Sequence, residues 1–482
     1  MKTDELNLKK MDDTLWEIEK QGPMNVPGRI YANDALIGDI KQDDSMKQVA
    51  NVATLPGIEG YSYAMPDIHW GYGFPIGGVA AFDKQDGIIS PGGVGYDINC
   101  GVRFVRTNLS EEDVAPNIKK VLGGIFNAVP SGVGSSGAIG KISISDEREL
   151  LKNGASWAVD QGFGRPEDLK YTEDQGRMTG ADPDALSDRA LERGRTQIGT
   201  LGSGNHFLEV DVVDQIFDGR VADELGLEIG QVILQIHSGS RGLGYQVCDD
   251  HVKDLVHTAS DYGIHLEDKQ LACAPAQSPE GQKYRRAMAC AANYAWVNRQ
   301  VMMHNALEAV SSALSLSHPL DYQLIYDVCH NIAKVEEHEV NGTTKDLIVH
   351  RKGATRSLPP GHELVPEPYK DIGQPVLVPG DMGSSSYLLV GSDGAPRKSF
   401  GSACHGAGRA ASRTQMKKQM QGKDLNEMMS SRGVYVKSDT WKGMAEEMPD
   451  AYKDVSRVVD AVQDANLARK VVRVRPIGVA KG

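Results

Sequence analysis

The chain has 482 residues, enough for one large domain or two to three ordinary domains with a sizeable core. It contains 53 glycines against 8 phenylalanines, which indicates many tight turns and places where the backbone approaches a ligand. The formal charge of −13 argues against a general polyanion-binding protein, because such proteins carry a net basic face that neutralises phosphates.

Any nucleic-acid site must therefore depend on local positive charge. Arginines stand in glycine- and serine-rich turns, and further basic residues follow one another near the C-terminus. These positions are Arg241, Arg409, Arg413, Arg469, Lys470, Arg473, Arg475 and Lys481. For any single one of them, a solvated surface charge is the alternative interpretation.

Cysteine usage and the first residues bear on the cellular setting. The six cysteines form no C-x-x-C pair, and the stretch MKTDELNLKKMDD contains no apolar signal segment. We therefore expect a reduced, cytoplasmic environment. No run of roughly 18 apolar residues occurs, so we expect no membrane-spanning helix.

The first half of the chain predicts a helix followed by strands and further helices. Residues 43–57 (DDSMKQVANVATLPG) predict a helix that a Pro-Gly pair closes. From Tyr61 to Leu109, short apolar runs are broken by glycine, which predicts strands joined by tight turns. Helices are expected at 111–128, 183–195 and 245–259.

Two short apolar runs in the middle of the chain predict buried strands. They are VILQIH, which ends in His237, and LIYDVC, which His330 follows. Strand ends are positions where a rigid scaffold presents ligands. Both histidines are therefore candidates for a site.

Residues 280–313 have sustained helical periodicity, so we interpret Met302, Met303 and His304 as packing residues. A helical region near 440–468 and a terminal strand (VVRVRPIGV) follow. No internal repeat or linker divides the chain. We therefore predict a mixed α/β fold: a single large catalytic domain, residues 1–482, with mixed sheets around a central metal and nucleotide cleft.

The segment GGVGYDINCG places a carboxylate and a thiol, Asp97 and Cys100, three residues apart among glycines that let the backbone fold tightly. Both side chains can then converge on one cation. The alternative is that Cys100 is a small buried apolar residue and Asp97 a turn former.

Three histidines have neighbours of similar type, Gly, Asn or Ser: His206 in GNHFLE, His237 in IHSGSRG and His330 in VCHN. A single histidine is more often a core or surface residue. Three of them beside Gly, Asn or Ser indicate a site, because neutral imidazoles bind divalent transition ions. The spacing does not choose the ion: Asp and His suit Mn²⁺, whereas a thiolate ordinarily favours Zn²⁺.

His405 lies in GSACHGAGR, between small residues that expose it and near Arg409, which can hold phosphate oxygens. This pattern is typical of a nucleophile placed against a nucleotide, because attack on an α-phosphate divides one phosphoryl exchange into two steps. A further metal ligand, or a loop histidine without a role, is the alternative. Residues 379–386 (PGDMGSSS) can cradle phosphates or base edges, but they match no P-loop.

The motifs DINCGVR, GxGNHF, HSGSRGxG, CHN, PGDMG and HGAGR follow one another in this order. From about Met65 to Gly482, the chain thereby resembles the RtcB family of RNA-splicing ligases. The resemblance implies two Mn²⁺ ions, a bridging role for Cys100, and His405 as the guanylylated residue. The Mn²⁺ ligands that it implies are Asp97, Cys100, His206, His237 and His330.

The resemblance also implies binding positions for GTP and RNA. The GTP positions are Asn205, His206, Phe207, Leu208, Glu209, His330, Asn331, Pro379, Gly380, Asp381, Met382, Ser386, His405, Gly406, Ala407, Gly408 and Lys481. The positions expected beside the RNA substrate are Arg241, Arg409 and Asp67.

The implied reaction joins RNA ending in a 2′,3′-cyclic phosphate or 3′-phosphate to RNA with a 5′-hydroxyl. His405 attacks GTP and releases pyrophosphate, the guanylate passes to the RNA 3′-phosphate, and the 5′-hydroxyl displaces GMP. A cyclic end is first opened by water. The implied partners are tRNA halves or broken RNA, and an archease-type activator.

Two other functions stay open from the residues alone. A metallophosphoesterase acting on RNA ends needs the same Asp, Cys and His cluster but no nucleotide and no covalent histidine. A non-catalytic RNA-binding accessory factor uses the metal for structure.

Overall fold

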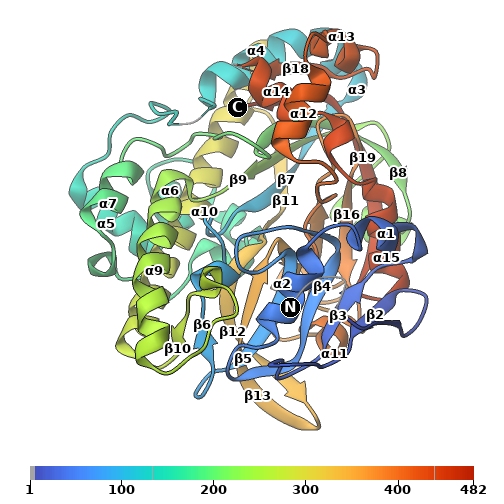
Figure 1. Ribbon diagram of the computed structural model, residues 1–482. Helices are drawn as coiled ribbons and strands as arrows, with labels where there is room; N and C mark the ends of the chain where they lie inside the picture. The colour runs from blue at the N-terminus through green and yellow to red at the C-terminus, as the bar shows by residue number, and fades with distance from the viewer. Residues whose placement is uncertain (1–5, 133, 439) are drawn as a thin grey trace.

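Figure 1 shows the computed structural model, which describes residues 6–132, 134–438 and 440–482. Seven strands form one large sheet. In order across the sheet they are β1 (Leu8–Lys10), β2 (Leu15–Ile18), β3 (Gly28–Tyr31), β4 (Ile58–His69), β5 (Ile76–Asp83), β13 (Thr343–Lys352) and β12 (Asn331–Val340). Strands β3 and β4 pair in parallel, whereas the other neighbours are antiparallel.

A second large sheet has eight strands. In order they are β11 (Tyr322–Cys329), β7 (Gly101–Ser110), β9 (Gln231–Ser238), β8 (Phe207–Ile216), β19 (Ala468–Lys481), β16 (Ser386–Gly391) and β15 (Pro375–Val378), and β18 (Tyr435–Ser438) pairs in parallel with β19. Both large sheets are therefore mixed, and the predicted fold class is confirmed. Two small sheets pair β6 (Ile88–Ile89) with β10 (Ala274–Pro275) and β14 (Ala354–Arg356) with β17 (Ser402–Cys404).

Strand β9 shows why apolar residues follow one another directly in the predicted buried runs, as in Val232–Leu234. Leu234 and Ile236 pack in one core cluster with Met302 and Met303 of helix α10 (Pro279–Leu314). Ile233, on the opposite face of the sheet, packs in a different cluster. Because both faces of this strand are covered, apolar residues can stand at successive positions, and the polar Gln235 and His237 are buried as well. The packing role predicted for the two methionines is confirmed.

The helices predicted from long periodic stretches are present. They are α2 (Ser45–Val52), α9 (Arg241–Asp261) and α10, a 36-residue helix that runs through the molecule in Figure 1. None of the helices within the described residues has the length and apolarity needed to cross a membrane.

Prolines and turns divide other predicted helices. The helical segment expected at 111–128 is confirmed in its bounds, but it is divided into α3 (Glu111–Val114), a 3-10 turn around Pro116, and α4 (Ile118–Ala128). Pro116 lacks an N–H group and cannot continue an α-helical hydrogen-bond ladder. Likewise, 183–195 contains a 3-10 turn and α7 (Asp188–Gly194), and 440–468 contains α14 (Trp441–Glu446) and α15 (Val455–Asp464).

Four neighbouring strands of the eight-stranded sheet each have one terminus on the same side of the sheet, which we call one edge. The order β11-β7-β9-β8 is antiparallel at each step, so the starts of β7 and β8 lie beside the ends of β9 and β11. Gly101, the first residue of β7, is opposite both Ser238 and Cys329, and Phe207 is opposite His237. Residues that flank these four ends must therefore come together in space.

Candidate active site

The predicted metal ligands flank these four strand ends. Cys100 directly precedes β7 and His206 directly precedes β8. His237 is the second-last residue of β9, and His330 directly follows β11. All four side chains are buried. The antiparallel order of the strands thus gathers ligands that are up to 230 positions apart in the sequence.

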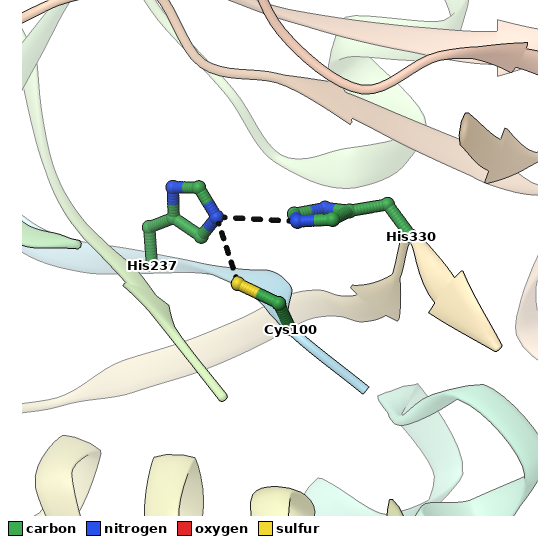
Figure 2. Close-up of side chains that lie close together, drawn as sticks. All are labelled: Cys100, His237 and His330. Atoms are coloured by element: carbon green, nitrogen blue, oxygen red, sulfur yellow. Dashed lines mark hydrogen bonds between the residues drawn. The ribbon is translucent and has the colours of Figure 1, made fainter. Parts of the chain in front are cut away.

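Cys100 is shared between two groups of candidate ligands. Its Sγ lies 3.3 Å from Nε2 of His206 and 3.3 Å from Nε2 of His237. Figure 2 shows how Nε2 of His237 in turn faces Nε2 of His330, at 3.3 Å. On the other side, Nε2 of His206 is 2.7 Å from Oδ2 of Asp97. The two groups are Cys100 with His237 and His330, and Cys100 with Asp97 and His206.

The orientation and protonation of the three imidazoles are suited to binding a cation. Nδ1 of His206 lies 2.9 Å from the carbonyl oxygen of Leu201, so Nδ1 carries a proton and Nε2, which faces Asp97, is the nitrogen that would bind an ion. Burial lowers the pKa of His237 and of His330 well below the usual range, and the neighbouring histidines lower both further. Both rings are therefore neutral near pH 7, which is the form that binds metals.

The two anionic donors complete a set that fits a metal. Burial acts to raise the pKa of Asp97, but the contact with His206 outweighs it and lowers that pKa to about 2. Burial, and then the Asp97 carboxylate, raise the pKa of the Cys100 thiol well above its usual range. A divalent cation offsets the cost of the buried thiolate, because a metal-bound thiol loses its proton.

His405 lies beside this cluster, with its ring centroid 4.7 Å from that of His330. Its Nδ1 is 2.6 Å from Oδ2 of Asp67, and the same oxygen accepts the backbone N–H of His405 at 3.1 Å. A carboxylate only accepts hydrogen bonds, so Nδ1 carries the proton and Nε2 is left with its lone pair. His405 therefore has the arrangement of an oriented nucleophile.

A cavity of about 460 Å³ connects the metal cluster with His405. Residues from both large sheets and from the glycine-rich loops line it. The residues with predicted roles that line it are Asp97, Cys100, Asn205, Phe207, His237, His330, Asn331, Pro379, Gly380, Asp381, His405, Gly406, Ala407, Gly408, Arg409 and Lys481.

Residues 48–482 match the family model described as tRNA-splicing ligase RtcB. The chain belongs to the RtcB family. The resemblance inferred from the motifs is thereby confirmed, and it extends over nearly the whole chain.

Individual relatives agree in length as well as in sequence. The tRNA-splicing ligase RtcB of Thermococcus kodakarensis is 51% identical over 477 residues, which cover 98% of this chain and 99% of the relative. The protein of the same name from Archaeoglobus fulgidus is 51% identical over 478 residues, again covering 98% and 99%. The RNA-splicing ligase RtcB of Mycobacterium tuberculosis is 50% identical over 437 residues, 90% of this chain and 100% of the relative.

Other residues predicted to bind GTP lie behind the wall of the cavity. Leu208 and Met382 pack in apolar clusters with 0% and 1% exposure. In β8, alternate side chains point to opposite faces, so Leu208 faces away from Phe207 and Glu209. Leu208 is therefore a core residue in this RtcB chain, and its side chain does not line the cavity.

A buried polar group lies in the same region, and sequence reasoning found only part of it. Ser386 Oγ accepts hydrogen bonds from the Gly380 backbone N–H at 3.0 Å and from Gln235 Nε2 at 3.1 Å. Gln235 Nε2 is also 3.5 Å from Oε2 of Glu209. Burial, and then the neighbouring Asp211, raise the pKa of Glu209 well above its usual range. Gln235 and Asp211 do not lie in a recognisable sequence motif, so they were not identified from the sequence.

The three residues predicted to face RNA are all held by other protein groups. Asp67 orients His405, as described above. Arg241 is largely buried, and its Nε donates to Oγ1 of Thr200 at 3.1 Å. Arg409 lines the cavity but donates to Oε1 of Glu447 at 3.1 Å. Of these three residues, Arg409 is the one that lines the cavity.

Glu447 is a site residue that the sequence did not reveal. It is fully buried and lies within salt-bridge distance of Arg409, Arg413 and Lys481, at 3.1, 3.5 and 3.8 Å. It also accepts a hydrogen bond from Tyr452. Burial acts to raise the pKa of Glu447, but Lys481 and the two arginines lower it below its usual range. One carboxylate thus balances three cations at the cavity wall.

Arg299, in the long helix α10, makes five hydrogen bonds, the full capacity of a guanidinium group. Nε and Nη2 donate to the two carboxylate oxygens of Asp327 at 2.9 and 2.7 Å. Nη1 donates to the carbonyls of Asn99 and Ser238 at 2.7 and 2.9 Å, and Nη2 donates to Oδ1 of Asn99 at 3.0 Å. The helix was predicted as packing, so this role was missed.

These contacts hold together three segments that carry or adjoin candidate metal ligands. Asn99 precedes the shared ligand Cys100, Ser238 follows His237, and Asp327 lies in β11. Asn99 has a φ of 53°, a left-handed conformation that few residues other than glycine adopt. Both its carbonyl and its side chain are fixed by the arginine. Arg299 is therefore a positioning residue for the metal ligands.

Replacement of Arg299 by lysine is expected to weaken divalent-ion binding about 10- to 100-fold, the usual cost of losing an outer-shell partner. A single ammonium group cannot replace five donors aimed at three segments. Cobalt titration followed by visible absorption measures the affinity without any catalytic step.

Arg103→Lys is the matched control. Arg103 is equally buried and donates to the same Asp327 oxygen at 2.7 Å, but its Nη1 donates to Gln300 instead of to a metal-bearing loop. This variant is expected to lower the melting temperature while keeping the ion affinity near wild type. Equal affinities for the two variants would contradict the positioning role of Arg299.

Proposed function

We propose that this chain, an RNA ligase by its family, joins RNA with a 2′,3′-cyclic phosphate or 3′-phosphate end to RNA with a 5′-hydroxyl end. GTP and two Mn²⁺ ions serve the reaction. The observation that carries the proposal is the oriented imidazole of His405, 4.7 Å from the ring of the metal-ligand candidate His330 in one shared cavity. Strands from both large sheets supply this cavity, which supports one catalytic domain over residues 1–482.

The two ligand groups around Cys100 would hold the two ions. When bound, paired metal ions polarise phosphoryl oxygens and stabilise the charge that develops during transfer. The mixture of carboxylate, imidazole and one thiolate suits Mn²⁺ as well as Zn²⁺. We propose Mn²⁺ rather than Zn²⁺ because the family resemblance implies it.

His405 supplies the covalent step. Its Nε2 lone pair attacks the α-phosphorus of GTP, a P–N bond forms, and the bond to the bridging oxygen breaks to release pyrophosphate. Asp67 keeps the proton on Nδ1 at 2.6 Å and stabilises the positive charge that the ring gains. The guanylate then passes to the RNA 3′-phosphate, and the 5′-hydroxyl displaces GMP.

The nucleotide would lie along the part of the cavity wall formed by Phe207, Pro379, Asp381 and Lys481. Lys481 places a cation over the Phe207 ring, with Nζ 5.7 Å from the centroid. The buried Glu209 is a candidate acceptor for guanine N–H groups, because one of its oxygens has no protein partner among the described residues.

The substrates would be tRNA halves or broken RNA. The six cysteines are unpaired and buried, which supports a reducing, cytoplasmic setting in which the Cys100 thiol is preserved.

Labelling with [α-³²P]GTP and Mn²⁺ tests the proposal. We expect an acid-labile, base-stable label on the protein that is absent in His405→Ala and retained in His304→Gln, a histidine outside the cavity lining. A metallophosphoesterase would give no label. A structural RNA-binding factor would not join 3′-phosphate and 5′-hydroxyl RNA ends, and a label that persists in His405→Ala would contradict the assigned nucleophile.

A further inference from the structure

Aromatic side chains gather on a part of the cavity wall that the proposed GTP site leaves free. Trp70, Tyr72 and Tyr96 line the cavity. The rings of Tyr72 and Tyr96 meet edge to face, with centroids 5.3 Å apart. Tyr245 stacks on Tyr96 with centroids 4.8 Å apart and an interplanar angle of 29°. We refer to these four residues as the aromatic cluster.

Two members of the aromatic cluster are half exposed, Trp70 and Tyr245, each at 48%. Single exposed aromatic residues are common and need no explanation. Here, however, Tyr245 stacks on an aromatic ring of the cavity lining, and Trp70 belongs to that lining. Keeping such apolar area in contact with water costs free energy, which a ligand with a flat apolar face would recover.

The aromatic cluster is attached to the metal-bearing segments themselves. Tyr96 directly precedes the candidate ligand Asp97, and Tyr245 lies in the first turn of α9, which begins four residues after His237. Both rings are thus held at a fixed position relative to the reaction centre. A nucleotide whose base stacks here would have its sugar and phosphate next to the metal ligands.

Charges of both signs lie near the aromatic cluster: a cation stands beside Tyr245, and the carboxylates of Asp249 and Asp268 act on Tyr72. The guanidinium of Arg193 lies 5.3 Å from the centroid of the Tyr245 ring. Aromatic faces combined with cations are the elements by which proteins bind single-stranded nucleic acid without reading its sequence.

We propose that the aromatic cluster is a stacking site for the unpaired base at one reacting end of the RNA. The inference rests on the proposed RNA ligase function. It adds a binding site to that function, because none of the four residues contacts GTP or metal in the proposal above. Base stacking is tolerant of sequence, so the site would accept any of the four bases.

The test uses the full-length protein and two short single-stranded RNAs that carry 2-aminopurine at the end under study. One ends in a 3′-phosphate with the fluorescent base there, and the other begins with a 5′-hydroxyl with the fluorescent base there. Stacking on an aromatic ring quenches 2-aminopurine, so quenching of one RNA identifies the end that occupies the site. Absence of quenching with both RNAs would overturn the proposal.

Trp70→Ala and Tyr245→Ala are expected to weaken binding of the quenched RNA roughly five- to 150-fold, the range for loss of a stacked base. Tyr245→Phe, which keeps the ring, should bind like wild type. The matched control is Tyr262→Ala: Tyr262 caps the opposite end of α9 from Tyr245 and is 47% exposed, so it lies away from the aromatic cluster.

Alanine variants that bind RNA as tightly as Tyr262→Ala, with unchanged circular dichroism, would refute the stacking site. GTP labelling of His405 needs no RNA and is measured on the same preparations. Loss of labelling in the wild type would refute the proposed function, whereas normal labelling with weak RNA binding in Tyr245→Ala places the defect in the aromatic cluster.

Discussion

Replacement of Cys100 by alanine is expected to abolish RNA joining and to weaken divalent-ion binding on the order of a hundredfold or more. Its sulfur lies 3.3 Å from both His206 and His237 and belongs to both ligand groups, so one substitution damages both ion sites. Isothermal titration with Mn²⁺ measures the affinity, and joining of 3′-phosphate and 5′-hydroxyl ends measures the activity.

Cys248→Ala provides the control for loss of a buried thiol. Cys248 is buried in α9, where its sulfur faces the carbonyl of Pro91. This variant should keep wild-type ion affinity and activity. A Cys100→Ala protein that is folded and joins RNA normally would show that the metal assignment is wrong.

The same thiol makes ion binding dependent on pH. Because burial and Asp97 raise the pKa of Cys100, the thiol is protonated in the free protein and must release its proton when an ion binds. His237 and His330, whose pKa is lowered by burial, are already neutral and release none. The ion association constant should therefore rise about tenfold per pH unit near neutrality, and this slope should vanish in Cys100→Ala.

Replacement of Asp67 by asparagine is expected to slow guanylylation of His405 roughly 10²- to 10⁴-fold. The carboxylate accepts at 2.6 Å from Nδ1 of the imidazole, which leaves the Nε2 lone pair for attack. An asparagine amide can instead donate to Nδ1 and move the proton onto Nε2, so the nucleophile is blocked while the shape of the side chain is unchanged. Single-turnover labelling with saturating [α-³²P]GTP measures the rate.

Glu209→Gln gives the contrasting result that separates orientation from binding. Glu209 lies in the polar group behind the nucleotide wall and not at His405. We expect this variant to require more GTP for half-maximal labelling and to keep a near-normal saturating rate. If Asp67→Asn also changed only the GTP concentration required, then the carboxylate would be a binding residue and not the orienting partner of His405.

Local patterns in the sequence predicted a large part of the site. His237 and His330 stand at the ends of apolar runs, and a strand end is recognisable from its own residues, whereas Cys100 and His206 stand among glycine and asparagine residues. The loop of small residues around His405 is likewise recognisable from the neighbouring residues in the sequence. Recognition of the motifs in their fixed order then supplied the family, which the comparisons confirm.

Residues that act through distant partners could not be found in this way. Arg299 is one of many polar residues in a long helix, and its role depends on two carbonyls about 60 and 200 positions away. Glu447 has an ordinary local sequence, and its function as counter-charge follows from Arg409 and Lys481 meeting at one point. Propensity and periodicity contain no information about such contacts.

The sequence by itself determined the chemistry available to this RtcB protein: the ligand types, the nucleophile candidate and the apolar strands that present them. The tertiary structure alone decided which groups touch. Antiparallel pairing of β11, β7, β9 and β8 brings four strand ends to one edge, so that Cys100 becomes shared between two ligand groups. The contact with Asp67 likewise selects the free nitrogen of His405, because a tautomer is set by the partner of the other ring nitrogen.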